Sequence, residues 1–118
     1  MANGQTSTYE AYEAAKIAKE ANDHANESIY HLRIPDELPD TIKTQLQKSV
    51  SDISTAYYMR MKAYEAAMEF LDNNKPSYLD NFNENWQGAD IFIKSGVMHY
   101  MAVKVSLGIL NQKKKKQR

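Results

Sequence analysis

The chain of 118 residues contains no cysteine, only three prolines and only four glycines. Without cysteine it can form neither a disulfide nor a thiolate metal site, and this favours a cytoplasmic protein. It also lacks a run of about 18 apolar residues free of charge, so we expect no membrane span. Its first residues have neither the basic nor the apolar region of a signal peptide, so we expect no such peptide.

The chain has no excess of either charge, because 15 basic residues balance 15 acidic ones. Dedicated nucleic-acid binders usually carry a basic excess, so we expect no specific nucleic-acid binding. The C-terminus alone is basic, through Lys113, Lys114, Lys115, Lys116 and Arg118. These five residues could supply weak, salt-dependent affinity for nucleic acid. We expect one domain over residues 1–112 and a mobile basic tail over residues 113–118.

Helical periodicity runs along most of the chain, and the few prolines mark its breaks. The spacing of apolar residues predicts helices over about 8–32 and 40–73, and a third helix after Pro76. Asp40 is the expected N-cap of the second helix, and Gly88 could interrupt the third. The sequence therefore predicts an all-α antiparallel bundle of three long helices, or four if the last breaks near Gly88.

Stripes of small residues indicate how the first two helices pack. The stripe on the first helix consists of Ala14, Ala18, Ala21, Ala25, Ile29 and Leu32. The stripe on the second consists of Ser49, Ala56, Ala63 and Ala67, beside a larger apolar stripe of Leu46, Val50, Ile53, Tyr57, Met61, Tyr64, Met68 and Leu71. Alanine is also simply a good helix former. Since both small stripes keep their phase for several turns, we expect a close antiparallel contact between them, with Ala15 exposed.

The last helix has two apolar faces. One face consists of Phe92, Ile93, Tyr100, Val103, Leu107 and Leu110. The other consists of Ile91, Met98, Ala102, Val105 and Ile109. A helix with two apolar faces must bury both, so it is either the central helix of the bundle or in contact with another chain. A small three-helix bundle has no truly central helix, and we therefore expect a homodimer formed through the second face.

Acidic and histidine side chains share one flank of the first helix. They are Glu13, Glu20, His24, Glu27 and His31. Carboxylate and imidazole groups together could bind zinc or another transition metal. No second helix supplies a matching set of ligands, as metal sites in helical bundles require. We therefore expect a solvated flank and no metal site.

Ser95 and His99 lie one turn apart on the last helix, a pairing that raises the question of a hydrolase. Neither a nucleophile elbow nor a glycine loop for an oxyanion accompanies them. Hydrogen-bonded polar groups within the bundle are the simpler interpretation.

The remaining features favour an interaction protein over an enzyme. Tyr57, Met61, Tyr64 and Met68 are explained by packing of thioethers on aromatic rings, or alternatively by a ligand pocket. Because no catalytic or cofactor motif is present, we expect no enzymatic activity and no cofactor. Abundant asparagine and lysine are common in AT-rich bacteria and their phages. The sequence thus predicts a bacterial or phage accessory protein that binds itself and an unidentified protein. The alternative is a regulator that binds a ligand in the Tyr/Met core or nucleic acid through the tail.

Overall fold

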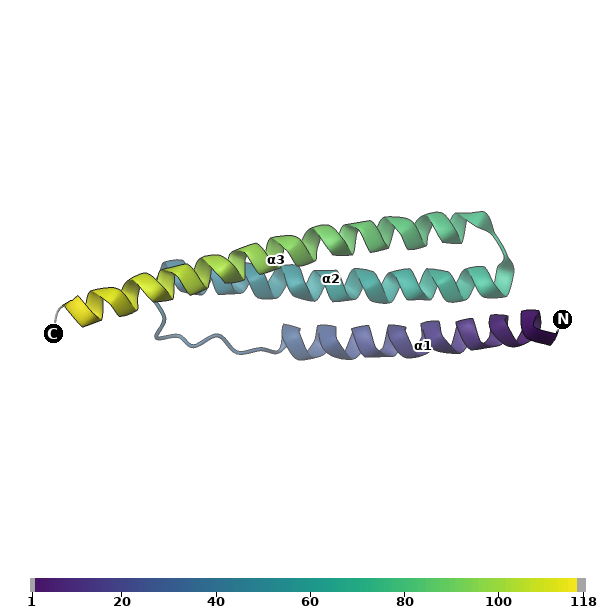
Figure 1. Cartoon of the computed structure of the whole chain (residues 1–118), viewed down its shortest axis with the longest axis horizontal. Coiled ribbons are helices and arrows are strands. Elements are labelled where there is room, and N and C mark those ends of the chain that lie inside the picture. Colours follow the sequence, from purple (N-terminus) through teal and green to yellow (C-terminus); the bar gives the residue numbers. More distant parts are fainter. Residues whose placement is uncertain (1, 117–118) are drawn as a thin grey trace.

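The computed structural model describes residues 2–116, which form three antiparallel helices joined by two connections (Figure 1). The helices are α1 (Ala2–Tyr30), α2 (Asp40–Asn73) and α3 (Pro76–Lys116). The prediction of an all-α bundle is confirmed. The form with a fourth helix is excluded, because α3 continues through Gly88 without a break. The bounds of α2 are those predicted, whereas α1 begins well before Thr8.

The ends of α2 follow from local backbone preferences. Pro39, rather than the predicted Asp40, occupies the N-cap position, and no side chain caps this end. At the other end Asn74 adopts the left-handed conformation, with φ of 58°, and donates its N–H to the carbonyl oxygen of Phe70. Pro76 then opens α3, because a proline at the first helical position gives up only an N–H that would be unpaired anyway.

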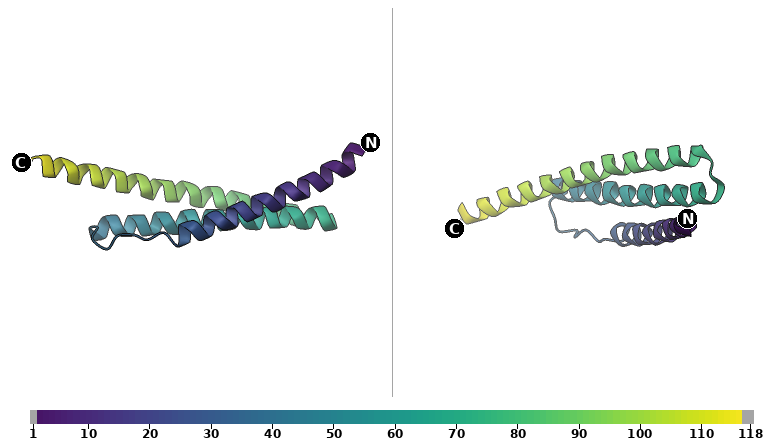
Figure 2. Two further views of the ribbon diagram at one scale, coloured as in Figure 1. Left: turned by 90° about the horizontal axis from the view of Figure 1, so that it is seen from below. Right: turned by 45° about the vertical axis from the view of Figure 1, so that its right-hand side comes forward.

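The molecule is a rod in which α2 is the central helix. The expectation that none of the three helices is central was therefore wrong. Its extents are 73 × 23 × 21 Å and its radius of gyration is 19.7 Å. A compact chain of this length would have a radius of gyration of about 13–14 Å. Within residues 2–116 α2 packs against both other helices, whereas α1 and α3 make no backbone contact with each other. Figure 2 shows α1 crossing one side of α2 while α3 runs along another.

Buried residues, most of them small, recur at every seventh position and bring α2 and α3 close together. The buried residues in these rows are Ile42, Ser49, Ala56 and Ala63 on α2, and Ala89, Gly96 and Val103 on α3. The hydroxyl of Ser49 donates to the carbonyl oxygen of Gly96 at 2.8 Å, which aligns the two rows. A seven-residue repeat is the signature of coiled-coil packing. The Ser49 row, expected to meet α1, therefore faces α3, which carries a matching row at the same spacing.

The contact between α1 and α2 is centred differently from the prediction. Ala15 is the one buried hydrophobic residue of α1 among residues 8–30, whereas Ala14 and Ala21 are exposed. The expectation that Ala15 is exposed was therefore wrong. The inner side of α1 also carries polar groups, since Asn26 accepts a hydrogen bond from the Ser54 hydroxyl of α2. A helical wheel of apolar residues alone misses asparagines on the inner side and so rotates the predicted face.

The core is thin for a chain of this length. Among the described side chains, the buried hydrophobic residues are Ala15, Ile42, Ala56, Ala63, Ala66, Ala89 and Val103. Most of these are alanines, and the larger apolar stripe of α2 is only half-buried. Near the turn between α2 and α3, Tyr64 meets the rings of Phe82 and Trp86 edge-on, and the last two stack at 5.7 Å. Much of the apolar surface of the chain therefore stays accessible to solvent.

Candidate interaction surface

The second apolar face of α3 is exposed over most of its length. We call Ile91, Met98, Ala102, Val105 and Ile109 the α3 face. The exposed fractions are 68% for Ile91, 70% for Met98, 63% for Val105 and 50% for Ile109, while Ala102 is half-buried. Ile91, Met98 and Val105 each follow a residue of the buried row by two positions, which places them about 200° around the helix from it. The α3 face therefore points away from α2.

The position of α2 decides between the two explanations of this face. If α3 were the central helix, the other two helices would cover both its sides. Instead α2 is central, and α1 makes no backbone contact with α3 within residues 2–116. The first face of α3 is buried at Val103 but 49% exposed at Tyr100 and 39% exposed at Leu107. Figure 1 shows the C-terminal end of α3 projecting beyond the start of α2. The α3 face is thus free to meet another chain.

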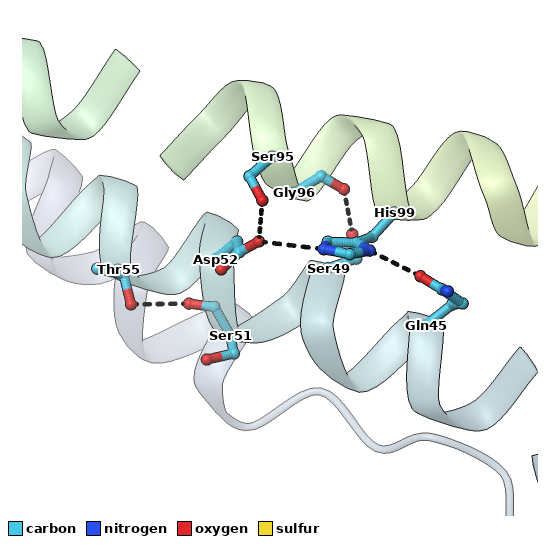
Figure 3. Close-up of polar contacts among 8 residues, drawn as sticks. All are labelled: Gln45, Ser49, Ser51, Asp52, Thr55, Ser95, Gly96 and His99. Carbon is cyan, nitrogen blue, oxygen red and sulfur yellow. Dashed lines mark hydrogen bonds and ion pairs between the residues drawn. The ribbon is translucent and has the colours of Figure 1, made fainter. Parts of the chain in front are cut away.

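A cluster of polar side chains holds α3 against α2 beside this face (Figure 3). The hydroxyl of Ser95 donates to Oδ2 of Asp52 at 2.6 Å. Nδ1 of His99 donates to Oε1 of Gln45 at 2.6 Å, and Nε2 lies 3.7 Å from Oδ2 of Asp52. These contacts and the hydrogen bond from Ser49 form together in one axial register of α2 against α3. Such partly buried networks favour one register over its neighbours.

The geometry of this cluster does not assemble a serine nucleophile. A hydrolase needs its serine hydroxyl bonded to a basic histidine, but here Ser95 donates to the carboxylate of Asp52. The interpretation of Ser95 and His99 as hydrogen-bonded polar groups is confirmed. Their partners, Asp52 and Gln45, were missed in the sequence. The available signal was their position within four residues of Ser49, on the side of α2 that carries the buried row.

An open groove of about 510 Å³ separates the cluster from the α3 face. Its lining residues are Gln45, Ile91, Lys94, Ser95, Met98, His99 and Ala102. Residues of the α3 face therefore form one wall, and residues of the polar cluster form the other. A partner that covers the face would also reach the hydrogen-bonding groups of the groove.

A second, apolar cavity of about 610 Å³, open to solvent, is lined by side chains from all three helices. It is lined by Ala11, Ala14, Ala15, Ala18, Tyr64, Ala67, Phe70, Leu71, Leu79 and Phe82. None of these residues is charged. Of the tyrosines and methionines proposed to line a pocket, Tyr64 lines this cavity and the other three do not. The alanines of α1 were not recognised as a wall.

The remaining sequence-derived sites are not brought together. Glu20, His24, Glu27 and His31 are exposed. No group of three acidic or histidine side chains in the described part of the chain is placed to hold a metal ion. The backbone of Lys113–Lys116 belongs to α3, but the side chains of these residues, and all of Arg118, lie outside the described residues. None of the three helices, over residues 2–116, is long and apolar enough to cross a membrane.

Comparison of the chain with protein-family models, curated proteins and solved structures finds no match. Function is therefore inferred from this chain's own residues. The α3 face is the feature that a self-contained three-helix bundle would not need, because such bundles bury the apolar stripe of every helix.

Proposed function

We propose that the chain is a non-enzymatic interaction protein that forms a homodimer through the α3 face. The observation that carries the proposal is the exposure of Ile91, Met98 and Val105, each more than 60% accessible on one side of one helix. Full burial of a side chain of this size contributes about 1.5–3 kcal/mol. Contiguous exposed apolar residues on a monomer commonly mark a protein-binding surface.

The thin core supports the same proposal. Among the side chains that the structure describes, five of the seven buried hydrophobic residues are alanines, which bury little area each. A second chain covering the α3 face would add larger side chains to a shared core. The proposal includes a cytoplasmic location, an accessory or regulatory role in a bacterium or phage, and binding of an unidentified protein.

Light scattering tests the homodimer directly. At micromolar concentration the chain of 13.5 kDa should scatter with about twice its own mass. Met98→Glu or Val105→Glu should shift it toward monomer, because each would bury an unpaired charge. Ile17→Glu is the matched control, since Ile17 is 65% exposed but lies on α1. A wild-type chain that stays monomeric at high concentration contradicts the homodimer.

A ligand-binding regulator is the second candidate, favoured by the apolar cavity between the three helices. Its volume lies within the usual range of about 300–1,000 Å³ for ligand pockets. The absence of charged groups from its lining favours a neutral apolar ligand. The nucleic-acid version of this candidate rests on the charge of the C-terminal tail alone.

Trp86, the single tryptophan, reports on this cavity because its ring stacks on Phe82, one of the lining residues. Titration with octylbenzene should shift the emission of Trp86 and saturate. Ala18→Phe should remove the shift by filling the cavity from α1. A response that is the same in both proteins would mean that the probe binds elsewhere.

A further inference from the structure

The charges of α3 are divided between its two ends. From residue 76 to residue 93 the acidic residues are Asp80, Glu84 and Asp90, with no lysine or arginine. From residue 94 onward the chain has no acidic residue, and α3 ends in four lysines. Asp80 and Glu84 are exposed, while Asp90 lies 3.8 Å from the guanidinium of Arg60. The α3 face therefore lies between a negative end and a positive end of the same helix.

The spacing along the α3 face is that of a coiled-coil seam. Counting Ser95, which is half-buried at the edge of the groove, the steps from Ile91 to Ile109 alternate between four and three residues. Residues with this spacing occupy the two core positions of a heptad, a and d, which alternate along the seam. In an antiparallel pair of identical helices, a residue at one of these positions packs against a residue at the other position of the second copy.

We propose that the partner on the α3 face is a second copy of this chain, docked antiparallel with its two-fold axis beside Tyr100. This inference rests on the proposed homodimer. Met98 then packs on the partner subunit's Ala102, Ser95 on the partner subunit's Val105, and Ile91 on the partner subunit's Ile109. In the first two layers a longer side chain meets a shorter one, so the interhelical space is filled evenly.

The charges at the two ends of α3 favour the antiparallel orientation over the parallel one. An antiparallel pair places the lysines at the end of one α3 beside Asp80 and Glu84 of the other copy, at both ends of the interface. A parallel pair would place the two lysine ends together, and like charges in proximity oppose association. It would also set Met98 against its own copy and Ala102 against its own copy, which leaves one layer crowded and another underfilled.

Because the chain has no cysteine, single-cysteine variants can test the orientation. Ile91→Cys and Ile109→Cys lie about 27 Å apart along the helix. They are unfolded, refolded together and treated with a short bismaleimide. The antiparallel pair predicts a crosslinked dimer from the mixture and none from either variant alone. Ile17→Cys mixed with Ile91→Cys is the control and should give none.

Each result decides a different claim. Crosslinking of each variant to itself, with a dimer in light scattering, means a parallel pair and overturns this inference while the homodimer stands. A dimer that crosslinks in no combination places the interface elsewhere and overturns it as well. A monomer in light scattering overturns both claims.

A charge-reversed variant tests the electrostatic part of the inference in the full chain. Asp80→Lys with Glu84→Lys should raise the dimer dissociation constant by about tenfold at low salt, because exposed opposite charges become like charges at both ends. The effect should fade as salt is added. Replacing Lys115 and Lys116 by glutamate in the same chain should restore association. An unchanged dissociation constant at low salt contradicts the orientation.

Discussion

The substitution Gly96→Ala tests the close contact between α2 and α3. A Cβ atom at Gly96 would lie 2.6 Å from Cγ1 of Ile53 and 3.2 Å from the backbone nitrogen of the same residue. The isoleucine side chain can rotate, but the backbone of α2 must move away. That shift would also stretch the bond of 2.8 Å from the Ser49 hydroxyl to the Gly96 carbonyl oxygen.

Effects of opposite sign set the change in the free energy of unfolding of Gly96→Ala. Overpacking of a tight contact costs about 1–3 kcal/mol, and loss of a neutral hydrogen bond adds about 1 kcal/mol. Alanine is favoured over glycine within a helix by about 1 kcal/mol. The free energy of unfolding should therefore fall by about 1–3 kcal/mol in Gly96→Ala.

Gly108→Ala is the matched control on the same helix. A Cβ atom at Gly108 has no neighbour within 4 Å, so only the helix propensity changes. This variant should be more stable than the wild type by about 1 kcal/mol. Urea unfolding followed by circular dichroism measures both, at one fixed protein concentration because a dimer is stabilised by mass action. If Gly96→Ala gains as much stability as Gly108→Ala, the close packing of α2 and α3 is refuted.

Further substitutions probe the other contacts. Ala15→Leu should destabilise the chain by about 1–3 kcal/mol in urea unfolding, whereas Ala21→Leu, at an exposed site of the same helix, should be nearly neutral. Ser49→Ala should lose about 0.5–1.5 kcal/mol in the same assay, with its bond to α3. Native mass spectrometry with zinc should show no stoichiometric adduct, and an adduct abolished by His24→Ala would contradict the solvated flank. A chain ending at Gln112 should keep its helical content, and the full chain should shift no DNA or RNA at about 150 mM salt in the presence of competitor.

The helices and their order could be read from the sequence because their signals are local. Pro39, Asn74 and Pro76 act on the backbone beside them, and the spacing of apolar residues fixes the helical period. The bounds of α2 were predicted correctly for this reason. Gly88 was less informative, since glycine both breaks helices and allows close packing. Here the side chain of Met59 fills the space that a Cβ atom of Gly88 would need.

Which helix faces which could not be read in the same way. The row of Ser49, Ala56 and Ala63 has two possible partners, and only the structure shows that α3 takes it. Asp52 was passed over because a carboxylate at the edge of a buried row looks like surface charge until Ser95 is placed against it. Which helix face packs against which depends on contacts between residues far apart in the chain, and a single sequence does not specify these contacts.

The exposed α3 face was predictable because it is a property of one helix. The seven-residue row that packs on α2 occupies one side of α3, and the apolar seam on the opposite side has no partner within the described chain. In the proposed dimer α3 is antiparallel to α2 on one side and antiparallel to its own copy on the other. In both arrangements the dipoles of neighbouring helices point in opposite directions, which is favourable. Both also place some small residues opposite larger ones, as at Gly96 and Ile53 between α2 and α3. The helix with two apolar faces would then join two thin cores into one thicker core.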